Sequence, residues 1–159
     1  MPDAKIKSKA ALIKILKKLG PREKIVFTNG CFDILHYGHI KYLEDAKRLG
    51  DILVVGLNSD ASVKRIKKTA RPIINQLDRA RILSGLASVD YVTIFTQDTP
   101  EALIKAVKPG VLVKGGDWGK DDIVGADFVS SYGGKVVTIP YIKGRSTSEI
   151  IDKIKRLKD

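Results

Sequence analysis

Five short apolar runs rich in β-branched residues recur along the chain, and stretches of helical periodicity separate them. The runs are KIVFTNG (24–30), DILVVGLNSD (51–60), YVTIF (91–95), GVLVKGG (110–116) and KVVTIP (135–140). Near-continuous apolar character is typical of strands buried on both faces of a parallel sheet. Helical spacing marks the intervening segments 77–89, 100–107 and 121–133. The pattern therefore predicts an α/β fold with one doubly wound, mainly five-stranded parallel sheet and helices on both faces.

The N-terminal segment precedes the first of these runs. Leu12, Ile13, Leu16 and Leu19 fall at helical spacing, and Gly20-Pro21 supplies a stop. We therefore divide the chain into an amphipathic helix and lead-in (1–22) and a single α/β domain (23–159). The sequence contains no internal repeat or linker that would divide it further.

Composition restricts the classes of protein to consider. The chain has one cysteine, so a monomer can form no disulfide framework and no multi-thiolate metal site. A single cysteine and the lack of a signal-peptide core predict a cytoplasmic protein, and no apolar run is long enough to span a bilayer.

The net charge of +11 favours polyanionic ligands. Nucleic acid and phosphorylated small molecules are the two classes of ligand, although a lysine-rich surface alone also explains part of the excess. The aromatic residues lie mostly in strand or motif positions, which argues against a nucleic-acid partner.

The only two histidines of the chain, His36 and His39, follow the first strand and a glycine turn in VFTNGCFDILHYGH. Their spacing places both imidazoles on one side of the first turn of a helix. A metal site would need further ligands that the chain lacks, and a general base is possible in principle. A helix N-terminus favours a bound anion, so phosphate binding suits the pair best. Gly38 between them would allow a ligand to approach the backbone closely.

A second helix start follows the last strand, in IKGRSTSEII (142–151). Ser146 and Glu149 have capping-box spacing and predict a helix that begins at Thr147. Arg145 and three hydroxyl groups would add to its anion-binding capacity. The basic run VKRIKK (63–68) and Arg71 follow the second strand, and Arg79 lies near another helix start, where it is expected to face a triphosphate.

These segments resemble the H-x-G-H nucleotidyltransferases, whose second signature is an S-T-[ST] segment at a late helix start. Within that superfamily the chain is most similar to the ADP-heptose synthase adenylyltransferases, also called D-glycero-β-D-manno-heptose 1-phosphate adenylyltransferases. The segments that carry the similarity, over about residues 24–152, are TNGCFDILH, GLNSDASV, RPIINQLDRARIL, DTPEALI, VLVKGGDW, IVGADFV and GRSTSEII. The resemblance implies a Rossmann-like sheet and the transfer of AMP from ATP to heptose 1-phosphate, a step in lipopolysaccharide core precursor synthesis.

Functional residues follow from the same resemblance. The implied catalytic residues are His36, His39 and Lys67. The implied nucleotide-binding residues are Thr28, Asn29, Gly30, Phe32, Gly38, Arg79, Gly115, Asp117, Arg145, Ser146, Thr147 and Ser148. The implied sugar-phosphate-binding residues are Asp33, Asn58, Asp60, Lys64 and Arg71, with Asp33 and Asp117 also candidates for the adenylate ribose. Cys31 is expected to be a small packing residue.

The resemblance also implies ligands and partners. Mg²⁺ is expected to be held mainly by the ATP phosphates rather than by a dedicated protein site. Because the first predicted strand begins at Lys24, we expect a separate sugar kinase to supply heptose 1-phosphate, and the family implies a homodimer. The main alternative is a cytidylyltransferase acting on glycerol 3-phosphate or a related polyol or amino-alcohol phosphate, although GRSTS carries arginine where those enzymes tend to have G-I-S-T-T or G-V-S-T-T. A nicotinamide-dependent enzyme would need G-x-G-x-x-G after the first strand, which is absent.

Overall fold

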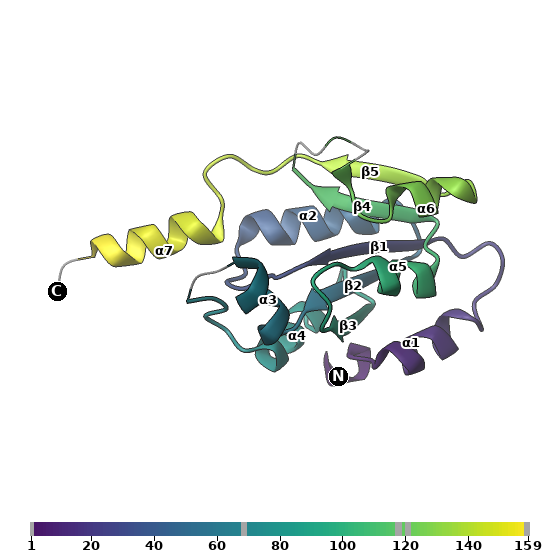
Figure 1. Ribbon diagram of the computed structural model, residues 1–159, viewed down its shortest axis with the longest axis horizontal. Helices are drawn as coiled ribbons and strands as arrows, with labels where there is room; N and C mark the ends of the chain where they lie inside the picture. The colour runs from purple at the N-terminus through teal and green to yellow at the C-terminus, as the bar shows by residue number, and fades with distance from the viewer. Residues whose placement is uncertain (1, 68–69, 117–118, 120–121, 158–159) are drawn as a thin grey trace.

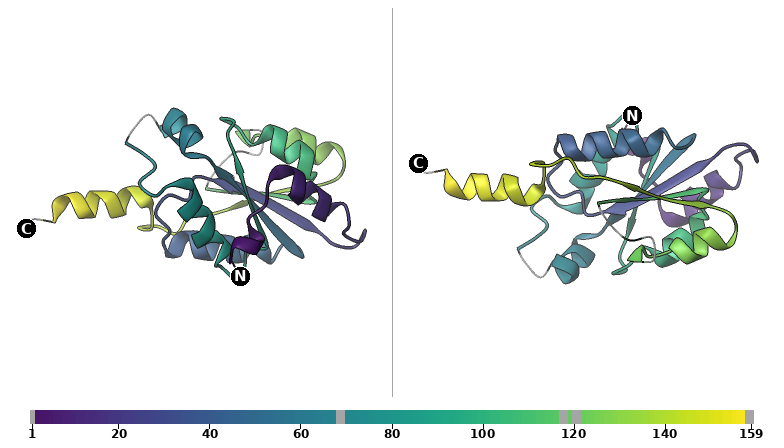
Figure 2. Two further views of the ribbon diagram at one scale, coloured as in Figure 1. Left: turned by 90° about the horizontal axis from the view of Figure 1, so that it is seen from below. Right: turned by 90° about the horizontal axis from the view of Figure 1, so that it is seen from above.

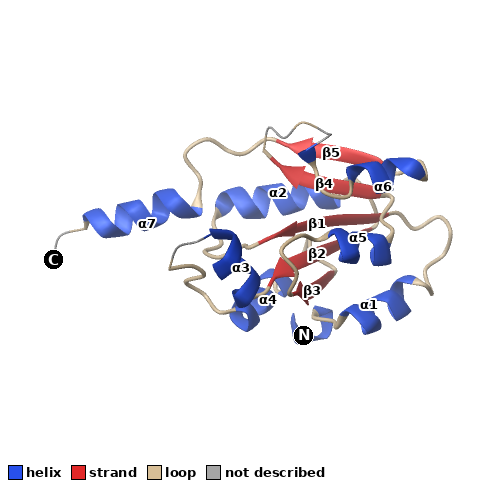
Figure 3. Ribbon diagram, in the orientation of Figure 1, coloured by secondary structure: helices blue, strands red, loops and turns tan. Residues whose placement is uncertain are grey.

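A computed structural model of the chain describes residues 2–67, 70–116, 119 and 122–157 (Figure 1). Five parallel strands form one sheet in the order β3-β2-β1-β4-β5 (Figure 3). The strands are β1 (Ile25–Gly30), β2 (Ile52–Asn58), β3 (Tyr91–Phe95), β4 (Val111–Gly115) and β5 (Lys135–Ile139). This confirms the predicted α/β fold and the positions of all five apolar runs.

Eight helical segments lie around the sheet in the part of the chain that the structure describes. They are η1 (Pro2–Lys5), α1 (Lys9–Leu16), α2 (Tyr37–Lys47), α3 (Asp60–Lys67), α4 (Gln76–Ser84), α5 (Glu101–Val107), α6 (Ala126–Ser131) and α7 (Thr147–Arg156). Figure 2 shows helices on opposite sides of the twisted sheet. On one face, Leu43 of α2 and Leu83 of α4 are buried against the strands. On the other face, Leu12 of α1, Ile104 of α5 and Val129 of α6 are buried. The double layer matches the prediction of helices on both faces.

The strand order creates a crevice at the carboxyl end of β1. The chain runs from β1 outward to β2 and β3, then crosses back to β4 on the other side of β1. The β1–β2 ladder continues to Gly30↔Leu57, whereas the β1–β4 ladder comprises Val26↔Val111 and Phe27↔Leu112. The strands β1 and β4 therefore part towards their carboxyl ends. In open parallel sheets, ligands bind at such a switch point.

The N-terminal segment packs as part of the same unit. Leu12 and Leu16 of α1 are buried in the core beneath the sheet. The Lys7 backbone N–H donates to the Val92 carbonyl oxygen at 2.9 Å, and Lys5 Nζ donates to the carbonyl oxygens of Leu86 and Val89 at 2.9 and 2.7 Å. The predicted amphipathic helix thus uses its apolar face within this chain, along the β3 edge.

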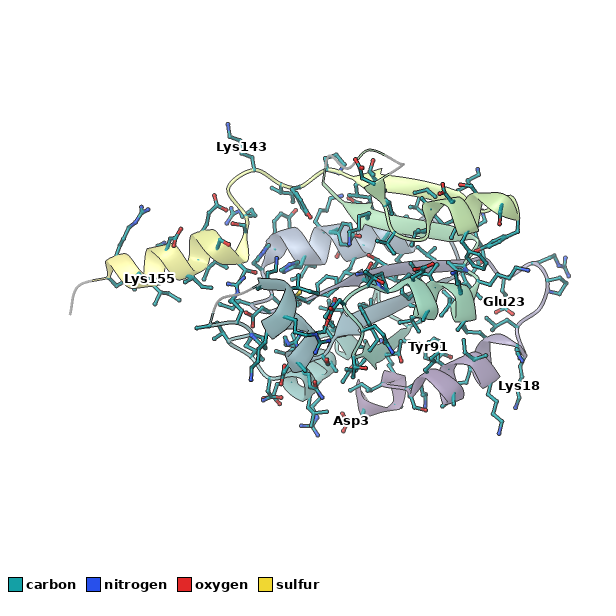
Figure 4. All side chains as sticks on the ribbon, in the orientation of Figure 1. Asp3, Lys18, Glu23, Tyr91, Lys143 and Lys155 are labelled. Atoms are coloured by element: carbon teal, nitrogen blue, oxygen red, sulfur yellow. The ribbon has the colours of Figure 1, made fainter. Side chains whose placement is uncertain are left out.

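The C-terminal helix α7 extends away from the sheet (Figures 1 and 2). It begins at Thr147, as predicted, because the Ser146 side chain caps it by accepting from the Glu149 backbone N–H. None of its residues is buried, and Lys143 before it and Lys155 on it project from the ribbon (Figure 4). Only the first turn of α7 is therefore near the crevice. None of the helices in the described ranges is long and apolar enough to cross a membrane.

Candidate active site

The loop after β1 is shaped by a glycine and a strained phenylalanine. A Cβ atom on Gly30 would lie 2.9 Å from Cε2 of Phe32, so a side chain there would displace the ring. Phe32 has a φ of 44°, in the left-handed region that non-glycine residues rarely adopt. Its buried ring meets the imidazole of His39 edge-on, with centroids 5.3 Å apart. Gly30 and Phe32 thus form part of the support for His39.

Thr28 supports the loop after β1 from within the core. It is fully buried near the end of β1, and its Oγ1 lies 2.6 Å from the hydroxyl of Tyr42 on α2. This hydrogen bond joins the strand to the helix that carries both histidines. Thr28, predicted to bind nucleotide, therefore lies beneath the loop as a support in this structure. Tyr42 was not predicted, because a tyrosine at a helical apolar position gives no functional signal in sequence.

The two histidines meet at the start of α2, as predicted. Their rings are stacked, with centroids 3.9 Å apart and an interplanar angle of 28°. His36 is the N-cap residue but makes no side-chain capping hydrogen bond. The Nδ1 atoms of both rings are buried and have no hydrogen-bond partner among the described residues. Two unsatisfied polar atoms therefore lie at a helix N-terminus, where an anion is favoured.

Burial decides the charge of this pair. Burial and, to a lesser extent, the neighbouring His36 together lower the pKa of His39 to about 4. Burial also lowers the pKa of His36, while Glu149 acts to raise it and Arg145 acts to lower it. His39 is consequently neutral near pH 7 and offers one N–H donor. Within the described residues, no group of three or more His, Cys, Asp or Glu side chains could hold a metal ion.

The late GRSTS segment packs directly on this helix start. A Cβ atom on Gly38 would lie 3.1 Å from the carbonyl oxygen of Arg145. Thr147 Oγ1 donates to the Ile34 carbonyl oxygen at 3.3 Å. Ser146 Oγ donates to Glu149 Oε2 at 2.8 Å, and Arg145 and Ser148 are exposed. The structure thus brings together the two segments that the sequence singled out, although 105 or more residues separate them along the printed sequence.

Asp33 has a different environment from the one expected. Its carboxylate is buried and accepts hydrogen bonds from the backbone N–H groups of Ile73 and Ile74 at 2.8–3.0 Å. Arg71 Nε lies 3.1 Å from the same carboxylate. Because these groups occupy the carboxylate, Asp33 and Arg71 tie the first loop to the segment 71–74. In this structure, both predicted sugar-phosphate ligands are engaged with each other.

Arg79 is likewise a structural brace in this structure, and the expectation that it faces a triphosphate does not fit its position. Its side chain has no exposed surface. Nε donates to the Ile74 carbonyl oxygen at 2.9 Å, Nη1 donates to the Cys31 carbonyl oxygen, and Nη2 donates to Asp60 Oδ1 at 2.7 Å. The sequence showed an arginine at a helix start, but the carbonyl partners become visible only in the fold. The predicted ligand Asp60 is thereby paired with Arg79.

The remaining residues predicted on the β2 side fall into two groups. Asn58 is buried, and its Nδ2 donates to Ser62 Oγ at 2.9 Å. Lys64 and Lys67 on α3 are exposed, and Lys67 is close enough to Cys31 to lower the pKa of its thiol. Burial outweighs this charge and raises the pKa of Cys31, which fits a packing residue better than a reactive thiolate.

The β4 side of the crevice contains a lysine that the sequence analysis missed. Lys114 lines a cavity of about 150 Å³ together with the predicted Asn29, and the other lining residues are Pro100, Leu112, Asp122, Ile123 and Val124. The sequence feature that could have indicated this residue is a lysine inside the otherwise apolar run GVLVKGG. A Cβ atom on Gly115 would lie 2.8 Å from Cε1 of Tyr141, so this glycine permits close packing of that ring. Asp117 lies outside the described residues.

Comparison with known proteins identifies the class. Residues 27–153 match the cytidylyltransferase-like family. The chain belongs to this family, which confirms the resemblance to H-x-G-H nucleotidyltransferases and the prediction of a nucleotidyltransferase enzyme.

Several curated relatives carry one name. The chain is 56% identical over 155 residues to "Bifunctional protein HldE" of Geobacter metallireducens, a match that covers 97% of this chain and 32% of the relative. It is also 56% identical over 155 residues to the protein of the same name from Campylobacter concisus, with 98% and 32% covered. The chain therefore spans about a third of the length of these curated relatives.

Solved structures agree on the fold. The crystal structure of the lipopolysaccharide core biosynthesis protein from Thermoplasma volcanium is similar, with a TM-score of 0.61, 30% identity, and 77% of this chain and 99% of that chain covered. Pantoate-β-alanine ligase from Francisella tularensis has a TM-score of 0.63 at 18% identity, over 97% of this chain and 79% of that chain. At 18% identity, the similarity to the ligase shows only a shared Rossmann-like fold.

Proposed function

We propose that the chain transfers AMP from ATP to D-glycero-β-D-manno-heptose 1-phosphate, giving ADP-heptose and pyrophosphate for lipopolysaccharide core precursor synthesis. The observation that carries the proposal is the contact of the H-x-G-H helix start with the GRSTS segment at the switch point of the sheet. The similarity to the relatives named HldE and to the lipopolysaccharide core biosynthesis protein of Thermoplasma volcanium supports this choice of product.

In the proposed reaction, a phosphate oxygen of the sugar 1-phosphate attacks the α-phosphorus of ATP. A new P–O bond forms there, and the bond from the α-phosphorus to the oxygen that bridges it to the β-phosphorus breaks. Pyrophosphate leaves with that electron pair. Because a phosphate monoester dianion is already a nucleophile, no general base is required. Catalysis then depends on aligning two anions and on stabilising charge at the α-phosphate.

The residues of this chain supply those functions in the proposal. Neutral His39 and His36 donate hydrogen bonds to the α-phosphate in this proposal, and the unsatisfied ring nitrogens of both residues at the start of α2 support that role. Arg145 and Ser148, both exposed at the start of α7, bind the β- and γ-phosphates. Backbone N–H groups beside Ser146 and Thr147 add donors, since both hydroxyls already donate within the protein. Mg²⁺ enters with ATP, held mainly by its phosphates.

The proposal extends to the setting of the enzyme. Its acceptor is a sugar 1-phosphate, so a sugar kinase activity must supply the substrate in the cytoplasm. We also propose a homodimer. Exposed Ile154 on α7 and Leu157 directly after it offer apolar surface for it, whereas the N-terminal helix uses its apolar face within the chain. Light scattering on the purified protein would give twice the mass of one chain.

A panel of nucleotides and phosphate acceptors tests the reaction. The protein would be incubated with ATP or CTP and with heptose 1-phosphate, other sugar 1-phosphates, glycerol 3-phosphate or phosphoethanolamine, and pyrophosphate release would be measured. We expect turnover with ATP and heptose 1-phosphate, and ADP-heptose by mass spectrometry. Turnover with CTP and glycerol 3-phosphate, and none with ATP and heptose 1-phosphate, would replace this proposal with a cytidylyltransferase.

A further inference from the structure

Lys114 is an unusual residue for its place in the sheet. It is the fourth residue of β4 and is half-buried, and it follows three buried residues, Val111, Leu112 and Val113. Burial lowers the pKa of its ammonium group, while Cys31 acts to raise that pKa and Lys67 acts to lower it. Keeping a charged side chain in such a place costs stability unless a partner of opposite charge compensates. Among the described residues, no carboxylate forms an ion pair with Lys114.

The second lysine approaches from the opposite wall of the crevice. Lys67 is the last residue of α3, which follows β2, and Lys114 is the penultimate residue of β4. Since β2 and β4 are the two neighbours of β1 in the sheet, the two lysines belong to elements on either side of the carboxyl end of β1. Each affects the pKa of Cys31 in the loop between them. Two cations directed at one small region repel each other, and a bound phosphate would relieve that repulsion. Their arrangement therefore favours an anionic ligand between them.

The cavity beside Lys114 suits a small polar molecule. Its volume of about 150 Å³ is well below the roughly 300–1,000 Å³ of pockets that enclose drug-sized ligands, so it has room for one sugar ring rather than a complete nucleotide. Asn29 and Asp122 supply an amide and a carboxylate at its wall, and both groups bond well to hydroxyls. Leu112 and Ile123 give it an apolar floor.

The side of the sheet on which this cavity lies also fits the reaction. Its apolar residues Leu112 and Ile123 belong to the core beneath α5 and α6. The histidine pair and the GRSTS segment lie at the start of α2, which packs on the opposite face. In-line displacement requires the attacking and leaving oxygens to lie on opposite sides of the α-phosphorus. An acceptor bound near Lys114 and a pyrophosphate bound near Arg145 would approach the α-phosphorus from different sides of the crevice, as that geometry requires.

We propose that Lys114, with Lys67, binds the phosphate of the acceptor sugar, and that Asn29 and Asp122 bind hydroxyls of the same sugar. This inference rests on the proposed function, since it assigns the acceptor of that reaction to a subsite. It makes Lys114 a residue that binds the nucleophile, and it places the sugar on the β4 side of the crevice, apart from the nucleotide phosphates.

Steady-state kinetics of Lys114→Ala test the assignment. Loss of a charge-assisted contact to phosphate is expected to raise the KM for heptose 1-phosphate by about tenfold to a hundredfold and to change the KM for ATP by less than about threefold. Lys114→Arg should recover part of the loss. The matched control is Lys18→Ala, which removes one positive charge from an exposed position beyond α1 (Figure 4) and should leave both KM values unchanged. A raised KM for ATP with an unchanged KM for the sugar phosphate would overturn the assignment.

Two further measurements separate binding from folding. Calorimetric titration of the wild-type protein and of Lys114→Ala with heptose 1-phosphate alone should show the same loss of affinity. Thermal unfolding of Lys114→Ala should show an unchanged or higher Tm, since a half-buried charge is removed, and Lys114→Met, which keeps an apolar stem, serves if the alanine variant does not fold. A large fall in the Tm of both variants with no change in sugar-phosphate affinity would make Lys114 a structural residue.

A failure of the proposed reaction can be distinguished from a failure of the subsite assignment. If the wild-type protein used a different phosphate acceptor, the proposed function would fail, and the same Lys114 comparison would be made with that acceptor. If the wild-type protein used heptose 1-phosphate and Lys114→Ala altered only the KM for ATP, the function would stand and the subsite assignment would fail.

Discussion

The imidazole rings of His36 and His39 stack at the first turn of α2 with their centroids 3.9 Å apart, and this contact ties their protonation together. Burial and the neighbouring ring together lower the pKa of His39 to about 4. A second proton on the pair would place two positive charges in contact at the positive end of a helix dipole. The free protein therefore presents neutral donors, ready for an anionic ligand.

The lowered pKa of His39 predicts a loss of stability in acid. Between about pH 6.5 and pH 4 the unfolded chain binds a proton at this residue and the folded chain does not, so the free energy of unfolding falls as the pH falls through that window. The effect is expected to be about 2 kcal/mol, and His39→Gln should remove most of it. Urea unfolding at pH 7 and pH 4.5 gives the difference for each protein. Equal losses in the two proteins would show that His39 does not contribute.

The catalytic role proposed for His39 makes a separate prediction. His39→Ala should lower kcat by about a hundredfold or more, the usual effect of removing one donor to a developing negative charge. Circular dichroism would confirm that the variant is folded. A fall in kcat of less than about threefold would remove His39 from the mechanism.

Much of the architecture was predictable because it depends on local patterns. Strand and helix periodicities placed all five strands, and the capping residue Ser146 placed the start of α7 at Thr147. The pairing of the H-x-G-H loop with GRSTS was expected from the rule that loops at the carboxyl ends of parallel strands share one edge. These inferences needed only the spacing of residue types along the chain.

The roles of Asp33 and Arg79 were not predictable in the same way. Most of their partners are backbone groups of Ile73, Ile74 and Cys31, which nearly any residue type would offer. A charged residue in a conspicuous motif resembles a ligand in sequence whether it faces a substrate or braces a loop. Lys114 was missed for the opposite reason, since a single lysine in an apolar run looks like the end of a strand. Burial distinguishes these cases, and burial is a property of the fold.

Gly38 lies where the H-x-G-H and GRSTS segments touch. We therefore expect that adding one methyl group at this position strongly lowers activity. In Gly38→Ala, the added Cβ would lie 3.0 Å from Nδ1 and Cε1 of His36 and 3.1 Å from the Arg145 carbonyl oxygen. Both neighbours would have to move, and misplacement of about 1 Å can cost a hundredfold in rate. We expect kcat/KM for ATP to fall by about tenfold to a hundredfold.

The control for this substitution is Gly20→Ala. A Cβ atom there would meet only Glu23 Oε2 at 3.7 Å, an ordinary contact, and should leave kcat/KM unchanged. Wild-type kinetics for Gly38→Ala would contradict the tight junction between the H-x-G-H and GRSTS segments.

Arg79 and Arg81 provide a matched pair on one helix for testing the brace beneath the site. Arg79 is fully buried and donates to two carbonyl oxygens and to Asp60, whereas the side chain of Arg81 is 58% exposed and lies 3.4 Å from Asp3. Removing one partner from a buried charge network leaves the others unsatisfied, so Arg79→Met is expected to lower the free energy of unfolding by about 3 kcal/mol. Arg81→Ala removes only exposed ion pairs and should cost less than about 1 kcal/mol.

Urea unfolding of both variants measures the two losses directly. Arg79→Lys should restore little of the stability, because one ammonium group does not match the planar, five-donor geometry with which the guanidinium reaches three acceptors. Similar losses for Arg79→Met and Arg81→Ala would contradict the brace. An Arg79→Met protein that kept wild-type stability but lost ATP affinity would instead return Arg79 to the nucleotide site, where the sequence first placed it.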